Sequence, residues 1–218
     1  MNEFTGVVSA TSTTTSYNLF NNIDTSNILT MKIDNEEITP VSIYTFLTNG
    51  EHEYFVRFNK SITSTYSMFS SCTGLTTLDI NKLDASNVTN MSRMFINCQS
   101  LTTVGDLSKW DTNKVSDMCG MFSGCTSLTS LDLTNWDISN VTDMSNMFGD
   151  CKSLTEVKMG GNPSYLTEGY AYGMFNEIYT TGKFYYNKAY NYSAILAHLP
   201  STWTAVPCTL VNGELIPN

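Results

Sequence analysis

The chain has few of the residues from which catalytic and metal sites are most often built. It contains two histidines, His52 and His198, which is almost no material for a histidine-based catalytic array or metal centre. Charged residues make up 14% of the 218 residues, and the 11 Lys and Arg are outnumbered by 20 Asp and Glu, so the net charge is -9. Because such a surface repels phosphate backbones and anionic membranes, binding to nucleic acid or to a lipid surface is not expected.

Long hydrophobic runs are also missing. No stretch of roughly 18 apolar residues exists, so no membrane insertion is expected. The first residues, MNEFTGVVSATSTTTSYN, lack the basic and apolar regions of a signal peptide, so export either is not encoded here or depends on a signal that was removed. In contrast, Ser, Thr and Asn together form about a third of the chain, which predicts a surface of mainly neutral polar side chains.

A repeat of 26 to 27 residues dominates the middle of the chain. The dipeptide Met-Phe recurs five times between Met68-Phe69 and Met174-Phe175, at intervals of 26, 27, 26 and 27. A cysteine follows four of these pairs, at Cys72, Cys98, Cys125 and Cys151. The clearest unit, residues 128–151, reads LTSLDLTNWDISNVTDMSNMFGDC, and the preceding unit has one extra residue, which we assign to a bulge or turn at Gly105.

Each unit changes its hydrophobic period along its length. Leu131 and Leu133 alternate as in a short half-buried strand. The apolar positions that follow have helical spacing: Val141, Met144, Met147, Phe148 and Cys151. The sequence therefore predicts an α/β repeat of strand, turn and short helix, stacked into a solenoid. Stacking predicts columns of equivalent residues, including Phe69, Phe95, Phe122, Phe148 and Phe175.

The chain divides into four expected parts. These are an extended Thr/Ser-rich arm (1–22), an N-terminal β cap (23–60), the repeat solenoid (61–178) and a mixed C-terminal cap (179–218). In the N-terminal cap, residues 43–47 and 54–58 are strand-like and flank the turn sequence TNGE, which predicts a hairpin. In the C-terminal cap, Asn212-Gly213 predicts a final hairpin, and Trp203 is expected to cover the last repeat.

The unit resembles the BspA-like leucine-rich repeats, in the variant with the pattern LxxLDLxxWDxSNVTDMSxMFxxC. The resemblance extends over residues 62–178, and the flanking segments TPVSIYTFLTNGEHEYFVRF, GKFYY and LPSTWTAVP are similar to those of such proteins from gut Bacteroidota. It departs from the pattern at Leu83, where later repeats have Trp, and at Lys114, where others have Asn. The resemblance implies a right-handed leucine-rich-repeat solenoid on a cell surface, a role in adhesion, and no catalytic residues.

Three sets of repeated side chains have both a structural and a functional interpretation. For the periodic cysteines we favour reduced core thiols over disulfides or a metal site, and for Cys119 we favour an inert thiol over a nucleophile. The carboxylates form two columns, Asp79, Asp106 and Asp132, and Asp84, Asp111 and Asp137. For these we favour Asx turns over calcium binding or glycoside hydrolysis. For Trp110 and Trp136 we favour core packing over a platform for sugar or peptide.

Tyrosines gather outside the regular repeats and form the candidate binding edge. Because tyrosine offers contact area at a modest entropic cost, we select five of them as binding residues: Tyr170, Tyr172, Tyr185, Tyr186 and Tyr190. The alternative for this cluster is a simple cap. No catalytic residue, cofactor or metal is expected.

The sequence favours a non-enzymatic interaction module, a secreted or cell-surface bacterial adhesin that binds a host or microbial protein or glycan through its repeat surface. The alternative is a virion decoration or fibre protein of a phage infecting Bacteroidota, anchored or assembled through the N-terminal arm. An enzyme ranks third, because acid, base and nucleophile do not meet in any recognisable constellation.

Overall fold

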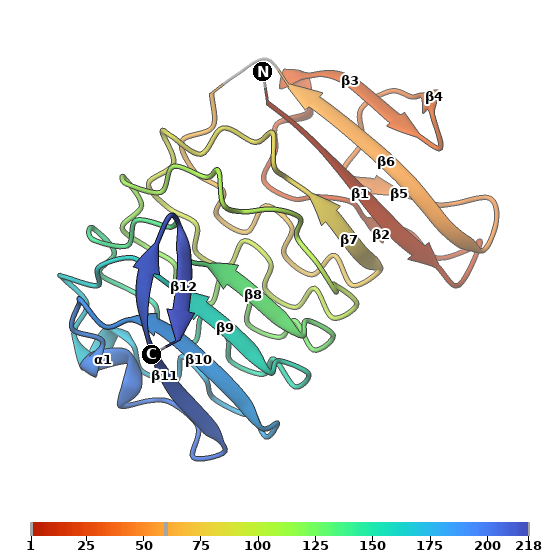
Figure 1. Cartoon of the computed structure of the whole chain (residues 1–218). Coiled ribbons are helices and arrows are strands. Elements are labelled where there is room, and N and C mark those ends of the chain that lie inside the picture. Colours follow the sequence, from red (N-terminus) through yellow and green to blue (C-terminus); the bar gives the residue numbers. More distant parts are fainter. Residues whose placement is uncertain (1, 59–60, 218) are drawn as a thin grey trace.

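The computed structural model describes residues 2–58 and 61–217, and strands follow one another along one side of the molecule (Figure 1). The first sheet, in the order β4-β3-β6-β1-β7, consists of β1 (Asn2–Ala10), β3 (Ile28–Ile33), β4 (Glu36–Glu37), β6 (Gly50–Phe58) and β7 (Leu75–Asp79). The second sheet, in the order β12-β11-β10-β9-β8, consists of β8 (Ser130–Leu133), β9 (Glu156–Met159), β10 (Gly182–Asn187), β11 (Trp203–Val211) and β12 (Glu214–Pro217).

The remaining elements are short. A separate two-stranded sheet pairs β2 (Tyr17–Asn18) with β5 (Ile43–Tyr44). The helical elements are α1 (Ser193–Leu196) and two 3-10 turns, η1 (Thr25–Asn27) and η2 (Glu168–Tyr170). Within the described ranges, no helix has the length and hydrophobicity that crossing a bilayer requires.

The expected α/β leucine-rich-repeat solenoid of strands and short helices is wrong. Strands account for 31% of the structure and helices for 5%. The segments predicted to be helical, such as residues 141–151, consist of turns and bends. The single α-helix among the described residues, α1, lies outside the repeats, in the C-terminal cap.

Left-handed residues explain why these segments do not form helices. In each repeat two residues with positive φ lie four positions apart, as at Gly120 (61°) and Gly124 (76°) or at Asn146 (54°) and Asp150 (59°). A left-handed residue ends a right-handed helical turn, and Gly, Asn and Asp adopt that conformation most readily. The predicted helix therefore becomes two successive tight turns.

The same turns direct backbone hydrogen bonds between repeats. The N–H of Met121 donates within its own turn to the carbonyl of Met118, whereas the N–H of Phe122 donates to the carbonyl of Met147 in the next repeat. An α-helix would use all of these donors internally. Neighbouring repeats are thus joined by parallel backbone pairing on the turn side as well as by β8, β9 and β10 on the strand side.

The phenylalanines form the expected column inside the stack. Their rings lie 5.5 Å, 5.2 Å, 6.1 Å and 5.4 Å apart from one repeat to the next. The members are Phe69, Phe95, Phe122, Phe148 and Phe175, all buried. Trp110 and Trp136 are also buried and stacked at 5.9 Å, and each indole N–H donates to a carbonyl of the preceding repeat, which confirms core packing for this pair.

The first residues do not form an extended arm. Instead β1 lies inside the first sheet, antiparallel to both β6 and β7. Its inward side chains Phe4 and Val8 are buried, and the Phe4 ring contacts Phe69 of the repeat column at 5.1 Å. The alternation of apolar and polar residues in β1 therefore decides that this segment forms a strand, although the residues after it are rich in Thr and Ser.

Strand pairing differs from the prediction in the N-terminal cap and agrees with it in the C-terminal cap. The expected hairpin between residues 43–47 and 54–58 is wrong, because β5 pairs with β2 while β6 lies between β1 and β3. The final hairpin is confirmed, with Asn212 and Gly213 both at positive φ between β11 and β12. Trp203 is buried and its ring lies 5.6 Å from Phe175, so it covers the last repeat as expected.

A buried histidine connects two turns of the N-terminal part. His52 Nδ1 lies 2.7 Å from Asp34 Oδ2, and its Nε2 lies 2.9 Å from the carbonyl oxygen of Thr48. The ring also stacks on Phe46 at 4.3 Å. Both nitrogens face oxygen acceptors, so only the protonated imidazolium satisfies both hydrogen bonds. Burial lowers the pKa of His52, but the hydrogen bonds to Asp34 and Thr48 outweigh it and raise the pKa.

We expect the His52 contacts to lose stability at alkaline pH. A raised pKa in the folded state gives stabilisation that is complete below the unfolded value of about 6.5 and disappears as pH rises through the folded value. Denaturation midpoints of wild type and His52→Gln, measured from pH 5 to 9, should therefore converge as pH rises. His198→Gln is the control and should run parallel to wild type, and a constant gap for His52→Gln would contradict the assignment.

Candidate binding surface

The outward side of the first sheet presents rows of polar side chains that cross four strands. Inward residues of β1, β3 and β6 are buried, so their alternate residues face outward. The strand register places Lys32 opposite Phe55, Phe55 opposite Thr5, and Thr5 opposite Asp79. We call these four residues the central row.

A second row beside it is an ion-pair network. Glu3 accepts a hydrogen bond from Arg57 Nε at 3.0 Å and from Lys82 Nζ at 2.8 Å. These hydrogen bonds to Lys82 and Arg57 lower the pKa of Glu3. The guanidinium carbon of Arg57 also lies 5.2 Å from the centre of the Phe55 ring, a cation–π contact. Arg57 is therefore held by Glu3 on one side and braces Phe55 on the other.

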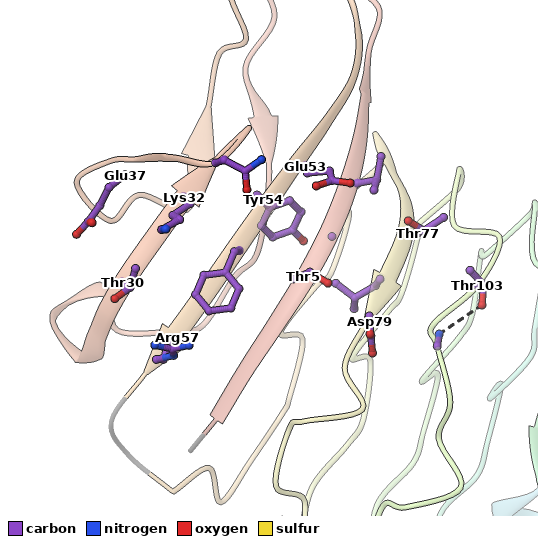
Figure 2. Close-up of a pocket in the computed structure, with 16 residues that line it drawn as sticks. Thr5, Thr30, Lys32, Glu37, Glu53, Tyr54, Arg57, Thr77, Asp79 and Thr103 are labelled. Atoms are coloured by element: carbon purple, nitrogen blue, oxygen red, sulfur yellow. Dashed lines mark hydrogen bonds between the residues drawn. The ribbon is translucent and has the colours of Figure 1, made fainter.

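The central row and Arg57 line an open hollow of about 770 Å³ on this side of the sheet. Figure 2 looks onto the hollow, with Lys32, Thr5 and Asp79 on three different strands. Below it Gly6 leaves room for the buried ring of Tyr54, since a Cβ on Gly6 would lie 2.3 Å from Tyr54 Cε1. Tyr54 donates a hydrogen bond to the Leu19 carbonyl, so the floor of the hollow is firmly packed.

A second hollow of about 410 Å³ continues from the first, and both are lined by Thr103 and Gly105. Gly105, the extra residue of its repeat, has φ 75° and packs against the backbone of Asp79. The second hollow lies between residues 103–108 and β8. The tip of the β11–β12 hairpin, at Gly213 and Glu214, also lines the second hollow. The hairpin tip packs closely there, since a Cβ on Gly213 would lie 3.2 Å from Asn135 Oδ1.

The sequence alone did not single out Lys32, Phe55 or Thr5. Each lies on a different strand, and these strands are neighbours through pairing between distant parts of the chain. The available signal was alternation: every second residue from Phe4 to Ala10 and from Tyr54 to Phe58 is non-polar or aromatic and buried, which leaves the residues between them on one outward face. Among the residues that the structure describes, no group of three or more His, Cys, Asp or Glu side chains is placed to hold a metal ion.

The repeat region matches a known family. Residues 63–179, more than half of the chain, match the family described as "Mycoplasma protein of unknown function, DUF285". The chain belongs to the DUF285 family. No curated protein and no solved structure matches the chain. The resemblance to BspA-like repeats is not tested by these matches and stays a prediction.

In this DUF285 protein the periodic cysteines are buried free thiols. The thiols of Cys98, Cys125 and Cys151 each donate to the carbonyl of a phenylalanine one repeat earlier, at 2.9 to 3.1 Å. Burial raises the pKa of Cys98 and of Cys151 to about 12 and that of Cys125 well above the usual value. Because a thiol must ionise to act as a nucleophile, these cysteines are structural, as the sequence predicts.

The two carboxylate columns form Asx turns, which confirms the structural interpretation. Each Asp accepts a hydrogen bond through Oδ1 from the backbone N–H two residues later, at 2.8 to 3.2 Å. The residues are Asp79, Asp84, Asp106, Asp111, Asp132 and Asp137. For Asp84 and Asp106 the hydrogen bonds to Ser86 and Ser108 lower the pKa.

The five candidate tyrosines do not share one environment in the DUF285 chain. Tyr170 and Tyr172 are exposed on the turn side, where the Tyr172 ring contacts His198 at 5.9 Å. Tyr185 lies beside Lys158 and Val206 in the second sheet. Tyr186 packs at 5.2 Å against the buried ring of Tyr192. Tyr190 is 40% exposed and follows β10.

Proposed function

We propose that this DUF285 protein is a non-enzymatic binding module that engages a protein or glycan partner through the outward side of its first sheet. One observation supports the proposal above others: the central row and Arg57, which is held by its ion pair with Glu3, line an open hollow of about 770 Å³ on a firmly packed sheet. Rigid strands present these side chains at spacings of about 4.8 Å, which suits recognition along an extended surface.

The chemistry of the surface suits binding better than catalysis. Catalysis requires an acid, a base or a nucleophile in mutual contact around one reacting atom. The closest charged groups here, Glu3 with Arg57 and Lys82, already satisfy one another as ion pairs. The remaining polar groups are spread over β1, β3, β6 and β7, so they offer many hydrogen bonds to a ligand rather than one reactive centre.

We place this module at a bacterial cell surface or in the secreted fraction. The resemblance of the repeats to BspA-like surface proteins supports that location, as does a surface rich in Ser, Thr and Asn. The alternative, a virion component, relied on anchoring through a free N-terminal arm. Because β1 is a central strand of the first sheet, that support is lost.

The test is binding of the whole chain to arrays of matrix proteins, mucins and glycans. Thr5 is exposed at the middle of the central row, so Thr5→Arg should obstruct the middle of the hollow and weaken any saturable binding by about tenfold or more. Thr204→Arg places the same side chain at an exposed position of β11 and should bind as wild type. Absence of any saturable binding, or binding that Thr5→Arg leaves unchanged, would refute the proposal.

A further inference from the structure

We infer that the ligand of this surface is an uncharged, polyhydroxylated chain, that is, a neutral glycan. The inference rests on the proposed binding function and names the class of partner. The order of chemical groups along the central row and the charges beside that row support it.

The central row alternates groups of different chemistry over a fixed span. Lys32, Phe55, Thr5 and Asp79 are register partners on β3, β6, β1 and β7, so the row covers three inter-strand steps. At about 4.8 Å a step, the span is roughly 14 Å. The row thus has a cation on β3 and a carboxylate on β7, with an aromatic ring and a hydroxyl between them, and Glu37 on β4 is the register partner of Lys32 on its other side.

The ends of the row remain open to a ligand. Lys32 forms no ion pair in the part of the chain that the structure describes. Asp79 uses Oδ1 to accept the Asn81 N–H, and a carboxylate has further lone pairs for other donors. By contrast, Arg57 and Glu3 in the second row satisfy each other. The groups available to a ligand thus include one amine donor, Lys32, and several carboxylate acceptors, Asp79, Glu37 and Glu53.

The presence of both signs of charge favours a neutral ligand. A hydroxyl group donates and accepts hydrogen bonds, so neighbouring hydroxyls can pair with Lys32 at one end and with Asp79 at the other. A polyanion would meet Asp79, Glu37 and Glu53, which also line the hollow, and the net charge of -9. A polycation would meet Lys32, the lining cation that forms no ion pair within the described ranges.

The hollow is lined by more charged residues than the centre of a typical protein interface, namely Lys32, Glu37, Glu53, Arg57 and Asp79. The centres of such interfaces are depleted in charged residues and enriched in apolar and aromatic ones. Of the outward residues that β1, β3 and β6 contribute, Phe55 and Val7 are apolar, and the others are Thr5, Thr30, Lys32, Glu53 and Arg57. One braced aromatic ring among hydroxyl and charged groups suits a sugar chain, which has apolar C–H faces and many hydroxyls.

The experiment is isothermal titration calorimetry of the whole chain. The probes are neutral hexasaccharides of β-1,4-linked glucose, mannose and N-acetylglucosamine, with heparin and polylysine as charged probes. We expect saturable binding of a neutral hexasaccharide, with an affinity that changes less than about twofold between 50 and 500 mM NaCl, since no counterions are released. Exclusive or tighter binding of heparin or polylysine, with steep salt dependence, would overturn the inference.

Variants connect binding to the central row. Phe55→Ala should weaken binding by about tenfold or more, and Lys32→Met, which keeps the apolar stem, by about three- to tenfold. Tyr185→Ala removes an aromatic side chain from the second sheet and should leave the affinity unchanged. Near-ultraviolet circular dichroism and thermal unfolding establish that each variant is folded. Neutral-glycan binding that Phe55→Ala leaves intact would also overturn the inference.

The outcomes separate the two proposals. If Thr5→Arg abolishes binding to a protein on the arrays while all neutral hexasaccharides fail to bind, the surface is a binding site but its ligand is not a neutral glycan. If neither the arrays nor the calorimetry shows binding, both proposals fail.

Discussion

Replacing Phe122 by alanine is expected to lower the free energy of unfolding by about 3 to 5 kcal/mol. Phe122 is fully buried at the centre of the phenylalanine column, 5.2 Å from the ring of Phe95 and 6.1 Å from that of Phe148. Its backbone N–H is bonded to the next repeat, which limits how far the neighbours can move to fill the cavity. The loss therefore includes both the transfer of the ring to water and an unfilled space.

Equilibrium denaturation with urea, followed by fluorescence and circular dichroism, measures this effect. Tyr179→Ala is the matched control, because Tyr179 is an aromatic residue near the same stack with 77% of its surface exposed. Its replacement should change stability by less than about 0.5 kcal/mol. A loss below about 1 kcal/mol for Phe122→Ala would show that the column does not hold the repeats together.

Gly160→Ala should destabilise the protein by about 3 kcal/mol through overpacking rather than through a cavity. A Cβ on Gly160 would lie 2.2 Å from the carbonyl oxygen of Thr134 in the preceding repeat. The obstructing atom belongs to the backbone, so no side-chain rotation can relieve the clash. Two repeats would have to separate where β9 pairs with β8, at the strand side of the stack.

Gly169→Ala provides the control for this second substitution. A Cβ on Gly169 meets no heavy atom within 4 Å, and Gly169 has no positive φ that alanine would resist. The two variants make the same chemical change and differ in the space available. Thermal and urea unfolding should show a clear loss for Gly160→Ala and a change within about 0.5 kcal/mol for Gly169→Ala. Equal stabilities would contradict the packing seen between the repeats.

The periodic features were predictable because a repeat relates each residue to its equivalent by one translation. Once the period of 26 to 27 is known, Phe95 must lie beside Phe122, and Trp110 beside Trp136, whatever the backbone does between them. The Asx turns and the Asn212-Gly213 hairpin were predictable for a different reason. They depend on contacts between residues within a few positions of one another.

The helices were wrongly predicted because apolar spacing alone does not distinguish a helix from two consecutive turns. Met118, Met121, Phe122 and Cys125 lie at i, i+3, i+4 and i+7 in either case. The informative residues were the glycines between them: Gly120 and Gly124 both have positive φ. Asn, Asp or Gly recurring at these positions in several repeats was the signal that favoured turns.

The sequence by itself determined the period of the repeats, the residues of the buried columns and the inert state of the periodic cysteines, since each follows from local chemistry and translation. Only the tertiary structure decided that β1 lies between β6 and β7 and that Lys32, Phe55, Thr5 and Asp79 form one row. These strands come from four separate segments. Their order and register result from which apolar faces bury one another best, and that choice involves the whole chain.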